Sequence, residues 1–347
     1  MKLLLVEEAR AGASLLEELL RREPDLELLP RVYSGADALA AVGRWNPQLV
    51  LMDLGLGGGR EGVETIASLM AISPRPIVAL DGPGDAPGAL AFESLSAGAV
   101  EVLERPRGDG AEAVRVFRER LLRTVRTMAD ARVVGRKRLS VRVPGAAPAE
   151  PKPHSLLVLG GSTGAPPLIY ALLRALPSPA PFPVVVAQHI VQGFEAGFAQ
   201  WLSGTGHPVS VARGGDWLES GKVYVAPADR DLVVRGGRLK TQPARGLAVP
   251  SVNALFESVA NFYGERAVGV LLTGMGSDGA EGLLAMRRAG ALTVTQVGAT
   301  CVVDGMPAAA RTLGAANRTL TPAEMLELMG SLARAASPGS PPRGGQG

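Results

Sequence analysis

The chain has one cysteine, Cys301, and only three histidines in 347 residues. A single cysteine makes an intramolecular disulfide impossible, so a reducing cytoplasm is the simplest compartment to expect. Cys301 is followed by two valines and is expected to be a small buried residue rather than a nucleophile. One cysteine and three dispersed histidines also cannot build a zinc site of ordinary ligand spacing.

Aromatic residues make up only 4% of the sequence, and long apolar runs are lacking. No stretch of about 20 apolar residues is present that would cross a bilayer. A strand pattern starts within the first three residues, which leaves no room for a secretory signal. We therefore expect no membrane insertion.

The sequence has the length and the apolar content of two domains. Its 347 residues exceed the span at which one core usually stops growing, and 46% of them are hydrophobic. We place a first domain at residues 1–130 and a second at 155–335. A linker at 131–154 and a disordered tail at 336–347 complete the chain.

The linker is rich in proline and alanine, which predicts a semi-rigid tether. A basic cluster at residues 135–142 contributes to the formal net charge of +3. Such a short charged run is typical of a solvated tether, so we predict no nucleic-acid partner. Contact of the cluster with an acidic protein surface stays open as an alternative.

Ser162 lies in a glycine-rich loop at residues 160–164, between an apolar run at 156–159 and an expected helix at 166–176. A strand, a tight turn and a helix in this order are typical of a nucleophile elbow, in which the serine backbone adopts sparsely populated angles. The N–H groups at the start of such a helix can face an oxyanion. The same pattern by itself is as typical of a phosphate cradle.

Two more polar side chains follow apolar runs of the strand type. His189 follows residues 184–188, and Asp278 lies in the loop after residues 268–272. Because the carboxyl ends of parallel strands share one edge of a sheet, we expect Ser162, His189 and Asp278 to converge there. Together they would supply a nucleophile, a base and an orienting acid.

His189 and Asp278 also have ordinary structural interpretations. His189 alone is typical of a hydrogen-bonded loop histidine, and Asp278 fits the N-cap of a helix at residues 280–289. Of the other histidines, His154 lies in the linker and His207 in a turn between glycine and proline. His189 is therefore the natural base of the chain.

Six segments of the second half, spread in order over about 170 residues, match the motifs of a known family. They are residues 161–164, 188–189, 223–227, 250–252, 272–279 and 300–307. With them the chain resembles, from Leu156 to about Glu327, the catalytic domain of the chemotaxis protein-glutamate methylesterases of the CheB type. This resemblance implies an α/β methylesterase domain with a doubly wound sheet.

The resemblance implies hydrolysis of glutamyl methyl esters on the cytoplasmic helices of chemoreceptors, and deamidation of receptor glutamines. Ser162 would be the nucleophile, His189 the general base and then acid, and Asp278 the group that orients the imidazole. Backbone N–H groups near Ser162 and Met275 would hold the oxyanion, and Thr163 would line the site. No metal or other cofactor is implied for this chemistry.

Two segments depart from the family pattern. Residues 228–231 lack a histidine that members often carry, and residues 248–253 lack a basic residue before Pro-Ser-Val. Arg213, Arg230 and Arg245 remain as cations that could approach an acidic receptor helix, although surface arginines are usually only solvated.

The first half alternates apolar runs with helical stretches. The runs at residues 3–6, 49–52, 77–80 and 100–103 predict a doubly wound parallel sheet. Acidic side chains follow the ends of two of these runs: Glu7, Glu8 and Asp53. Carboxylates at one sheet edge would suit Mg²⁺ beside a phosphorylatable aspartate.

This half resembles a response-regulator receiver domain of the CheY kind, a flavodoxin-like fold with a five-stranded parallel sheet. The resemblance implies Asp53 as phospho-acceptor, a weak Mg²⁺ site at Glu8 and Asp53, and a histidine kinase as partner. However, Asp81 stands in place of a hydroxyl, Arg105 in place of the usual lysine, and Val102 in place of an aromatic residue. An aspartate there would repel a phosphoryl group, and Arg105 could instead pair with Asp53 or Asp81.

We therefore hypothesise a degenerate receiver, with a working phospho-switch and a docking-only module as the alternatives. For the whole chain, a methylesterase is favoured over a non-catalytic signalling adaptor and over a serine hydrolase of small esters. In relatives of this layout the receiver covers the active-site edge. We therefore expect deletion of residues 1 to about 150 to raise turnover.

Overall fold

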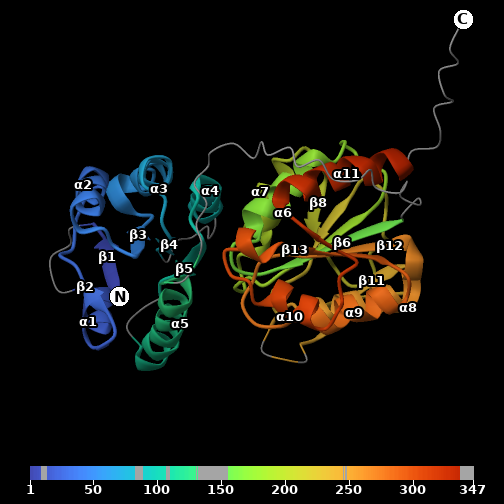
Figure 1. Ribbon diagram of the computed structural model, residues 1–347. Helices are drawn as coiled ribbons and strands as arrows, with labels where there is room; N and C mark the ends of the chain where they lie inside the picture. The colour runs from blue at the N-terminus through green and yellow to red at the C-terminus, as the bar shows by residue number, and fades with distance from the viewer. Residues whose placement is uncertain are drawn as a thin grey trace, which may run out of the picture.

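The computed structural model describes residues 1–8, 14–82, 89–106, 110–129, 131, 155–244, 246 and 248–336. Nearly all of the predicted linker and tail therefore lies outside the described residues. So do His154, Arg245 and the basic cluster at 135–142, and the predictions made for them remain predictions. Figure 1 shows two α/β units side by side, each built around its own sheet.

The first unit is a five-stranded sheet in the order β2-β1-β3-β4-β5, with every pair parallel. This is the flavodoxin-like order, so the predicted fold of the first half is confirmed. The strand pattern alone did not reveal β2, which has only two residues. The strands are β1 (Lys2–Val6), β2 (Glu27–Leu28), β3 (Leu49–Asp53), β4 (Ile77–Asp81) and β5 (Glu101–Glu104). The helices are α1 (Leu15–Arg21), α2 (Gly35–Trp45), α3 (Glu61–Ile72), α4 (Ala89–Ala97) and α5 (Ala111–Ala129).

The second unit is a seven-stranded sheet in the order β14-β13-β12-β6-β7-β9-β8, again with every pair parallel. An antiparallel hairpin of β10 and β11 lies beside it. The strands are β6 (Leu156–Gly161), β7 (Val184–Gln188), β8 (Val209–Val211), β9 (Val223–Val225), β10 (Arg230–Arg235), β11 (Arg238–Pro243), β12 (Ala267–Leu271), β13 (Leu292–Gln296) and β14 (Arg318–Leu320). The helices are α6 (Pro166–Ala175), α7 (Glu195–Ser203), α8 (Val252–Tyr263), α9 (Ala280–Arg288), α10 (Met306–Thr312) and α11 (Pro322–Ala336). Short 3-10 helices lie at Leu56–Gly58, Gly264–Arg266 and Gly298–Thr300.

The central strands β6, β7 and β12 are buried at every position. Helices cover both faces of a parallel sheet, which is why these strands are continuous apolar runs rather than alternating ones. The predicted doubly wound fold of the second half is confirmed. The loops after β6, β7 and β12 consequently leave the same edge of the sheet, and this edge carries the candidate site.

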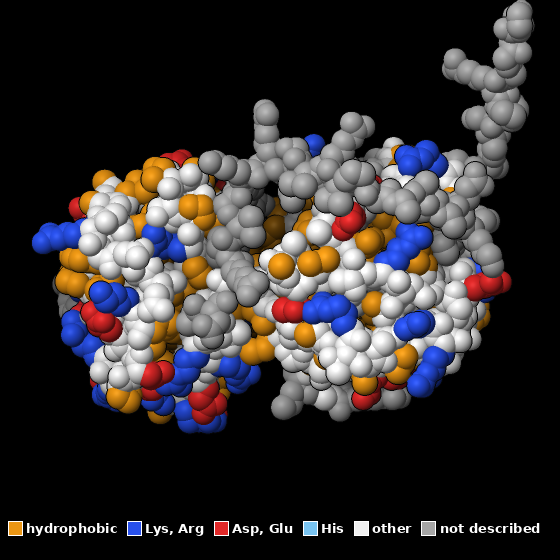
Figure 2. All heavy atoms as spheres, in the orientation of Figure 1, with side chains coloured by type: hydrophobic (Ala, Val, Ile, Leu, Met, Phe, Trp, Pro, Cys, Tyr) orange, Lys and Arg blue, Asp and Glu red, His pale blue; other side chains and the backbone are white. Residues whose placement is uncertain are grey.

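The first unit turns α4, β5 and α5 toward the second unit (Figure 1). Phe92 of α4 lies with its ring centroid 5.5 Å from that of Phe198 and 5.7 Å from that of Trp201. The Trp201 indole N–H donates to Ser96 Oγ at 3.1 Å. In Figure 2 the two units meet along a central seam, and lysine and arginine side chains gather low on the first unit, where Figure 1 places α5. The units are thus joined by an aromatic cluster and by direct polar contacts.

Candidate active site

Ser162 is held in the loop after β6 by hydrogen bonds to its backbone. Its N–H donates to Thr273 O at 3.0 Å, and Gln188 Nε2 donates to Ser162 O at 2.9 Å. The loop after β12 approaches so closely that a Cβ at Gly274 would lie 2.7 Å from Ser162 Cβ. A glycine is therefore needed at this position for the two loops to pack.

The positive φ of this loop does not fall on Ser162. Among the described residues, Asn46 is the only non-glycine residue with a positive φ, so the φ of Ser162 is negative. The left-handed position in this loop belongs to Gly164, at φ +78°, where a Cβ would clash with the side chain of Val302. The helix also starts later than an elbow requires, because Ala165 is the N-cap of α6. Contacts with the neighbouring loops hold the serine in place.

His189 and Asp278 form a direct pair, with His189 Nε2 2.8 Å from Asp278 Oδ2. Their side chains are 17% and 12% exposed, so the pair is largely shielded from water. The backbone N–H of His189 donates to Gly161 O at 3.0 Å, which fixes the loop after β7 against the loop that carries the serine. Ser162, the third residue of the predicted trio, lies near this pair because its loop leaves the same edge of the sheet.

The side chain of Asp278 caps the N-terminus of α8, although the residue itself directly precedes the N-cap of α9. Val252 N donates to Asp278 Oδ2 at 2.7 Å, and Asn253 N donates to Oδ1 at 3.0 Å. The interpretation of Asp278 as the N-cap of a helix at 280–289 is wrong, because Gly279 is the N-cap of α9 and makes no side-chain cap. A carboxylate at a helix N-terminus is stabilised by free N–H groups and by the helix dipole.

This environment explains the charge state of Asp278. Burial acts to raise the pKa of its carboxyl group, but the hydrogen bonds from His189 and from the backbone of Asn253 and Val252 outweigh burial. The net effect is a pKa below the ordinary value of 3.8. Asp278 is therefore an anion at neutral pH and can only accept hydrogen bonds from the imidazole.

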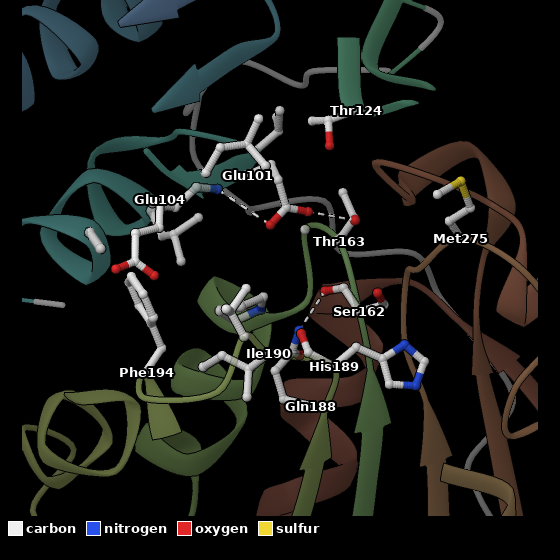
Figure 3. Close-up of a pocket in the computed structure, with 18 of the residues that line it drawn as sticks. Glu101, Glu104, Thr124, Ser162, Thr163, Gln188, His189, Ile190, Phe194 and Met275 are labelled. Carbon is white, nitrogen blue, oxygen red and sulfur yellow. Dashed lines mark hydrogen bonds between the residues drawn. The ribbon is translucent and has the colours of Figure 1, made fainter. Parts of the chain in front are cut away.

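Two of the three predicted residues, Ser162 and His189, line one cavity of about 430 Å³. Asp278 does not line it and contacts the His189 ring. The cavity is lined by Ser162, Thr163, His189 and Met275, and Figure 3 shows these side chains around the same space. Ser162 and His189 are both among the described residues, and no hydrogen bond links Ser162 Oγ to the His189 ring. The structure thus pairs His189 with Asp278 directly and places Ser162 at the same cavity as His189.

Sequence reasoning missed a fourth polar residue at the site. Ser251 is the N-cap of α8, and its Oγ accepts from Ala254 N at 3.2 Å while lying 3.1 Å from Asp278 Oδ1. Its own N–H donates to the fully buried Asp231 at 2.9 Å. A serine directly before an apolar helix is a recognisable cap signal, but only the structure reveals that the helix points at Asp278.

Replacing Ser251 by alanine is expected to lower the free energy of unfolding by about 1 kcal/mol, the usual cost of losing a helix cap. Turnover should also fall several-fold, because Asp278 loses one of the groups that orient it. Thermal unfolding and the rate on a methyl-ester substrate measure the two effects. Ser34→Ala is the matched control, since Ser34 caps α2 in the same way in the first unit. Equal turnover in the two variants would contradict an orienting role for Ser251.

Cys301 is 2% exposed, and burial, with a smaller contribution from Asp304, raises its pKa to about 12. At pH 8 only about one thiol in ten thousand would then be a reactive thiolate. Iodoacetamide should label the native chain far more slowly than the urea-unfolded chain, without inhibiting turnover. Rapid labelling of the native chain with loss of turnover would reinstate Cys301 as a nucleophile.

In the first unit the acidic side chains are neutralised by arginines. Arg105 Nη1 donates to Glu7 Oε1 at 2.8 Å, and Arg105 Nη2 lies 3.1 Å from Asp53 Oδ2. The second oxygen of Glu7 lies 3.2 Å from Arg31 Nη1, and Asp53 Oδ1 accepts from Gly55 N at 2.9 Å. Asp53 and Glu7 are only 5% and 7% exposed. Both carboxylates therefore have their oxygens engaged within the protein.

The sequence predicted that Arg105 could pair with Asp53 or with Asp81. In the structure it pairs with Asp53, and its second partner is Glu7. Burial and the nearby charges of Glu104 and Asp53 raise the pKa of Asp81. A guanidinium thus occupies the position between carboxylates that a divalent cation would need.

This arrangement does not fit a magnesium site. In the part of the chain that the structure describes, no three His, Cys, Asp or Glu side chains are grouped so as to hold a metal ion. The weak Mg²⁺ site at Glu8 and Asp53 therefore remains a prediction that the geometry does not favour.

The arginines expected near a receptor helix are not gathered at the cavity. Arg230 lies 3.2 Å from its neighbour Asp229, and Arg213 is exposed, with its backbone N–H bonded to Asp216. Arg245 lies outside the described residues. The cations that do line the cavity are Arg120 and Arg123 of α5, which the sequence gave no reason to place there.

The fold and the site together define a hydrolase on a parallel α/β sheet, joined to a receiver-like module. Comparisons with known proteins agree. Residues 157–329 match the family model described as CheB methylesterase. The chain belongs to the CheB methylesterase family.

Two similar proteins each span nearly the whole chain. One is protein-glutamate methylesterase/protein-glutamine glutaminase 3 of Anaeromyxobacter dehalogenans strain 2CP-C, 39% identical over 93% of this chain and 96% of that protein. The other, of the same name from Myxococcus xanthus strain DK1622, is 38% identical over 95% of this chain and 93% of that protein. The crystal structure of the Thermotoga maritima CheB methylesterase catalytic domain is 30% identical, with a TM-score of 0.49, and covers 52% of this chain and 98% of that one. Among the described helices, none has the length and apolar character to span a membrane.

Proposed function

We propose that this protein hydrolyses glutamyl methyl esters on the cytoplasmic helices of chemoreceptors, and deamidates glutamines at such positions. The observation that carries the proposal is the His189–Asp278 hydrogen bond of 2.8 Å beside Ser162 in one cavity. The names of the relatives, which specify a methylesterase and a glutaminase, supply the substrate class.

The orientation of the imidazole supports a distinct role for each ring nitrogen. Asp278 is an anion and accepts the proton of Nε2–H, so the lone pair of neutral His189 is on Nδ1. Nδ1 would take the Ser162 proton as Oγ attacks the ester carbonyl, after a side-chain rotation that brings the two together. The proton would then go to the leaving methoxide, releasing methanol and leaving an acyl-serine.

Hydrolysis completes the cycle by the same steps in reverse order. A water molecule would lose a proton to Nδ1 and attack the acyl carbonyl. The proton would return to Ser162 Oγ as the glutamate product leaves. In deamidation the leaving group is ammonia instead of methanol, with the same use of the imidazole.

Methanol release from a methylated receptor fragment tests the substrate assignment. We expect release from the receptor fragment and little turnover of a small ester such as p-nitrophenyl acetate. Turnover of the small ester alone would favour a general serine hydrolase. Absence of both, with intact receptor binding, would favour the signalling adaptor.

Regulation by the first unit is part of the proposal. The cavity is lined by Glu101, Arg120 and Thr124 of the first unit as well as by Ser162 and His189 of the second. This shared lining supports occlusion of the site in the described arrangement. Deletion of residues 1 to about 150 should then raise turnover of the receptor fragment, and unchanged turnover by a folded truncated chain would argue against occlusion.

Asp53 is expected to resist phosphorylation. Arg105 already neutralises its carboxylate, and the geometry does not provide the metal site that phosphoryl transfer to an aspartate needs. Incubation with Mg²⁺ and acetyl phosphate, followed by intact-mass measurement, should leave the chain unmodified. A stoichiometric acyl phosphate that disappears in Asp53→Asn would overturn the degenerate receiver.

A further inference from the structure

We propose that Thr163 binds the glutamyl side chain of the substrate, and that Glu101 of the first unit occupies this place as a built-in analogue of the product. The proposal rests on the function proposed above and names the group that reads the substrate. It also gives a chemical explanation of how the first unit blocks the site, because the Glu101 carboxylate competes with the substrate for the Thr163 hydroxyl.

The contact that carries the proposal joins the two units next to the nucleophile. Thr163 Oγ1 donates to Glu101 Oε2 at 2.6 Å, a short distance typical of a hydrogen bond to a carboxylate. Thr163 directly follows Ser162 in the chain, and both line the cavity. Figure 3 shows the Glu101 carboxylate directed from β5 toward Thr163, above Ser162 and His189.

Glu101 presents the same chemical group that the reaction produces. Hydrolysis of a glutamyl methyl ester yields a glutamate side chain with a free γ-carboxylate. The Thr163 hydroxyl carries a single proton, so it cannot donate to Glu101 and to a bound substrate or product at the same time. A receptor glutamyl group and Glu101 would therefore exclude each other at this donor.

The surroundings of Glu101 indicate a specific site rather than an incidental surface contact. Burial raises the pKa of Glu101, whereas the hydrogen bond from Thr163 and the charge of Arg120 act to lower it. Its other oxygen, Oε1, is 3.3 Å from Val102 N, so the carboxylate is held at both ends. Burying a carboxylate is costly unless polar partners are provided, and here Thr163, from the catalytic loop, is one of them.

Other contacts across the units do not share this chemistry. The cluster around Phe92 and Trp201 is aromatic, and Thr127 Oγ1 contacts the Met275 sulfur at 3.3 Å. Such contacts cover the site without resembling the substrate. Glu104 lies on the same strand and lines the same cavity, but it points away from Thr163 in Figure 3, so it is a matched acidic control for the contact with Thr163.

The test uses the full chain and a helical peptide carrying one glutamyl methyl ester, with its glutamate form as product. In Glu101→Ala, we expect KM for the ester peptide and the inhibition constant of the glutamate peptide each to fall at least about tenfold, since the loss of a hydrogen bond to a charged group has effects of this size. Glu104→Ala should leave both constants unchanged. Adding Thr163→Val to Glu101→Ala should cancel the gain in product affinity.

Glu101→Gln tests whether access of the substrate is controlled by the hydrogen bond to Thr163 or by the negative charge of Glu101. Its amide oxygen can still accept from Thr163, so its constants should stay close to those of the unchanged protein and far from those of Glu101→Ala. A glutamine variant that behaves like the alanine variant would mean that charge controls access, which overturns the proposal. A rise in kcat alone, or equal effects of Glu101→Ala and Glu104→Ala, would reduce Glu101 to a general interface contact and also overturn it.

The test distinguishes failure of this inference from failure of the proposed function. If Ser162 is labelled by a fluorophosphonate and methanol is released, but the glutamate peptide inhibits all variants equally, the esterase stands and the role of Glu101 and Thr163 falls. If no variant releases methanol from any methylated peptide, the proposed function fails, and this inference fails with it.

Discussion

Ser162→Ala is expected to abolish methanol release, with a loss of roughly a millionfold, the size seen when a serine nucleophile is removed from a comparable triad. The reason is chemical, since alanine offers no oxygen to attack the ester or to carry the acyl group. The residual rate would come only from binding and from polarisation of the carbonyl by nearby N–H groups. Single-turnover methanol release from a methylated receptor fragment measures the loss.

The fold should survive this change. The contacts that hold Ser162 in place use its backbone N–H and C=O, and these are unaltered in alanine. Thermal unfolding and near-ultraviolet circular dichroism should therefore match those of the unchanged chain. Ser210→Ala, at an exposed position of β8, is a matched control that should retain full turnover. Retained turnover in Ser162→Ala would remove Ser162 from the nucleophile role.

Asp278→Asn should reduce kcat by about ten thousandfold, as expected when the acid that orients a catalytic imidazole becomes an amide. The amide has one oxygen and one NH2 group, but the carboxylate accepts at both ends from His189, Val252, Asn253 and Ser251. An NH2 group facing Nε2 would force that nitrogen to accept, so the proton would move to Nδ1. The nitrogen that should receive the Ser162 proton would then already carry one.

The pKa of Asp278 predicts where acid affects the site. Because the folded-state pKa lies below 3.8, ionised Asp278 stabilises the folded protein fully above that value. The stabilisation is lost as the pH falls through the lower, folded-state pKa. Chemical unfolding followed from about pH 5 down to about pH 2 should therefore show an acid-dependent loss of stability that is smaller in Asp278→Asn. A loss of kcat below tenfold, or an identical pH dependence of unfolding, would contradict the orienting role of Asp278.

The loops that carry the candidate site could be predicted from the sequence because strand ends are local features. Short apolar runs mark β6, β7 and β12, and parallel strands bring their carboxyl ends to one edge. The pairing of His189 with Asp278 follows from this topology. The sequence did not reveal that the loop carrying Gly274 packs against Ser162 and helps to fix the serine loop.

Partners contributed by distant elements could not be predicted in the same way. The direction of α8 decides that Val252 and Asn253 cap Asp278, and the sequence marks only where that helix begins. The same is true of the side-chain partners in the receiver-like unit. Its departures from the family pattern were visible, but the pairing of Arg105 with both Glu7 and Asp53 depends on how β1, β3 and β5 lie side by side.

The sequence by itself determined the two α/β units, the family, and the three loops that bear Ser162, His189 and Asp278. Periodicity and short motifs specify these features, because each depends on residues close together in the chain. Only the tertiary structure decided which imidazole nitrogen faces Asp278, which cation neutralises Asp53, and that Glu101 reaches Thr163. These contacts join residues 52 to 89 positions apart, and their geometry is set by packing between elements rather than by any local preference.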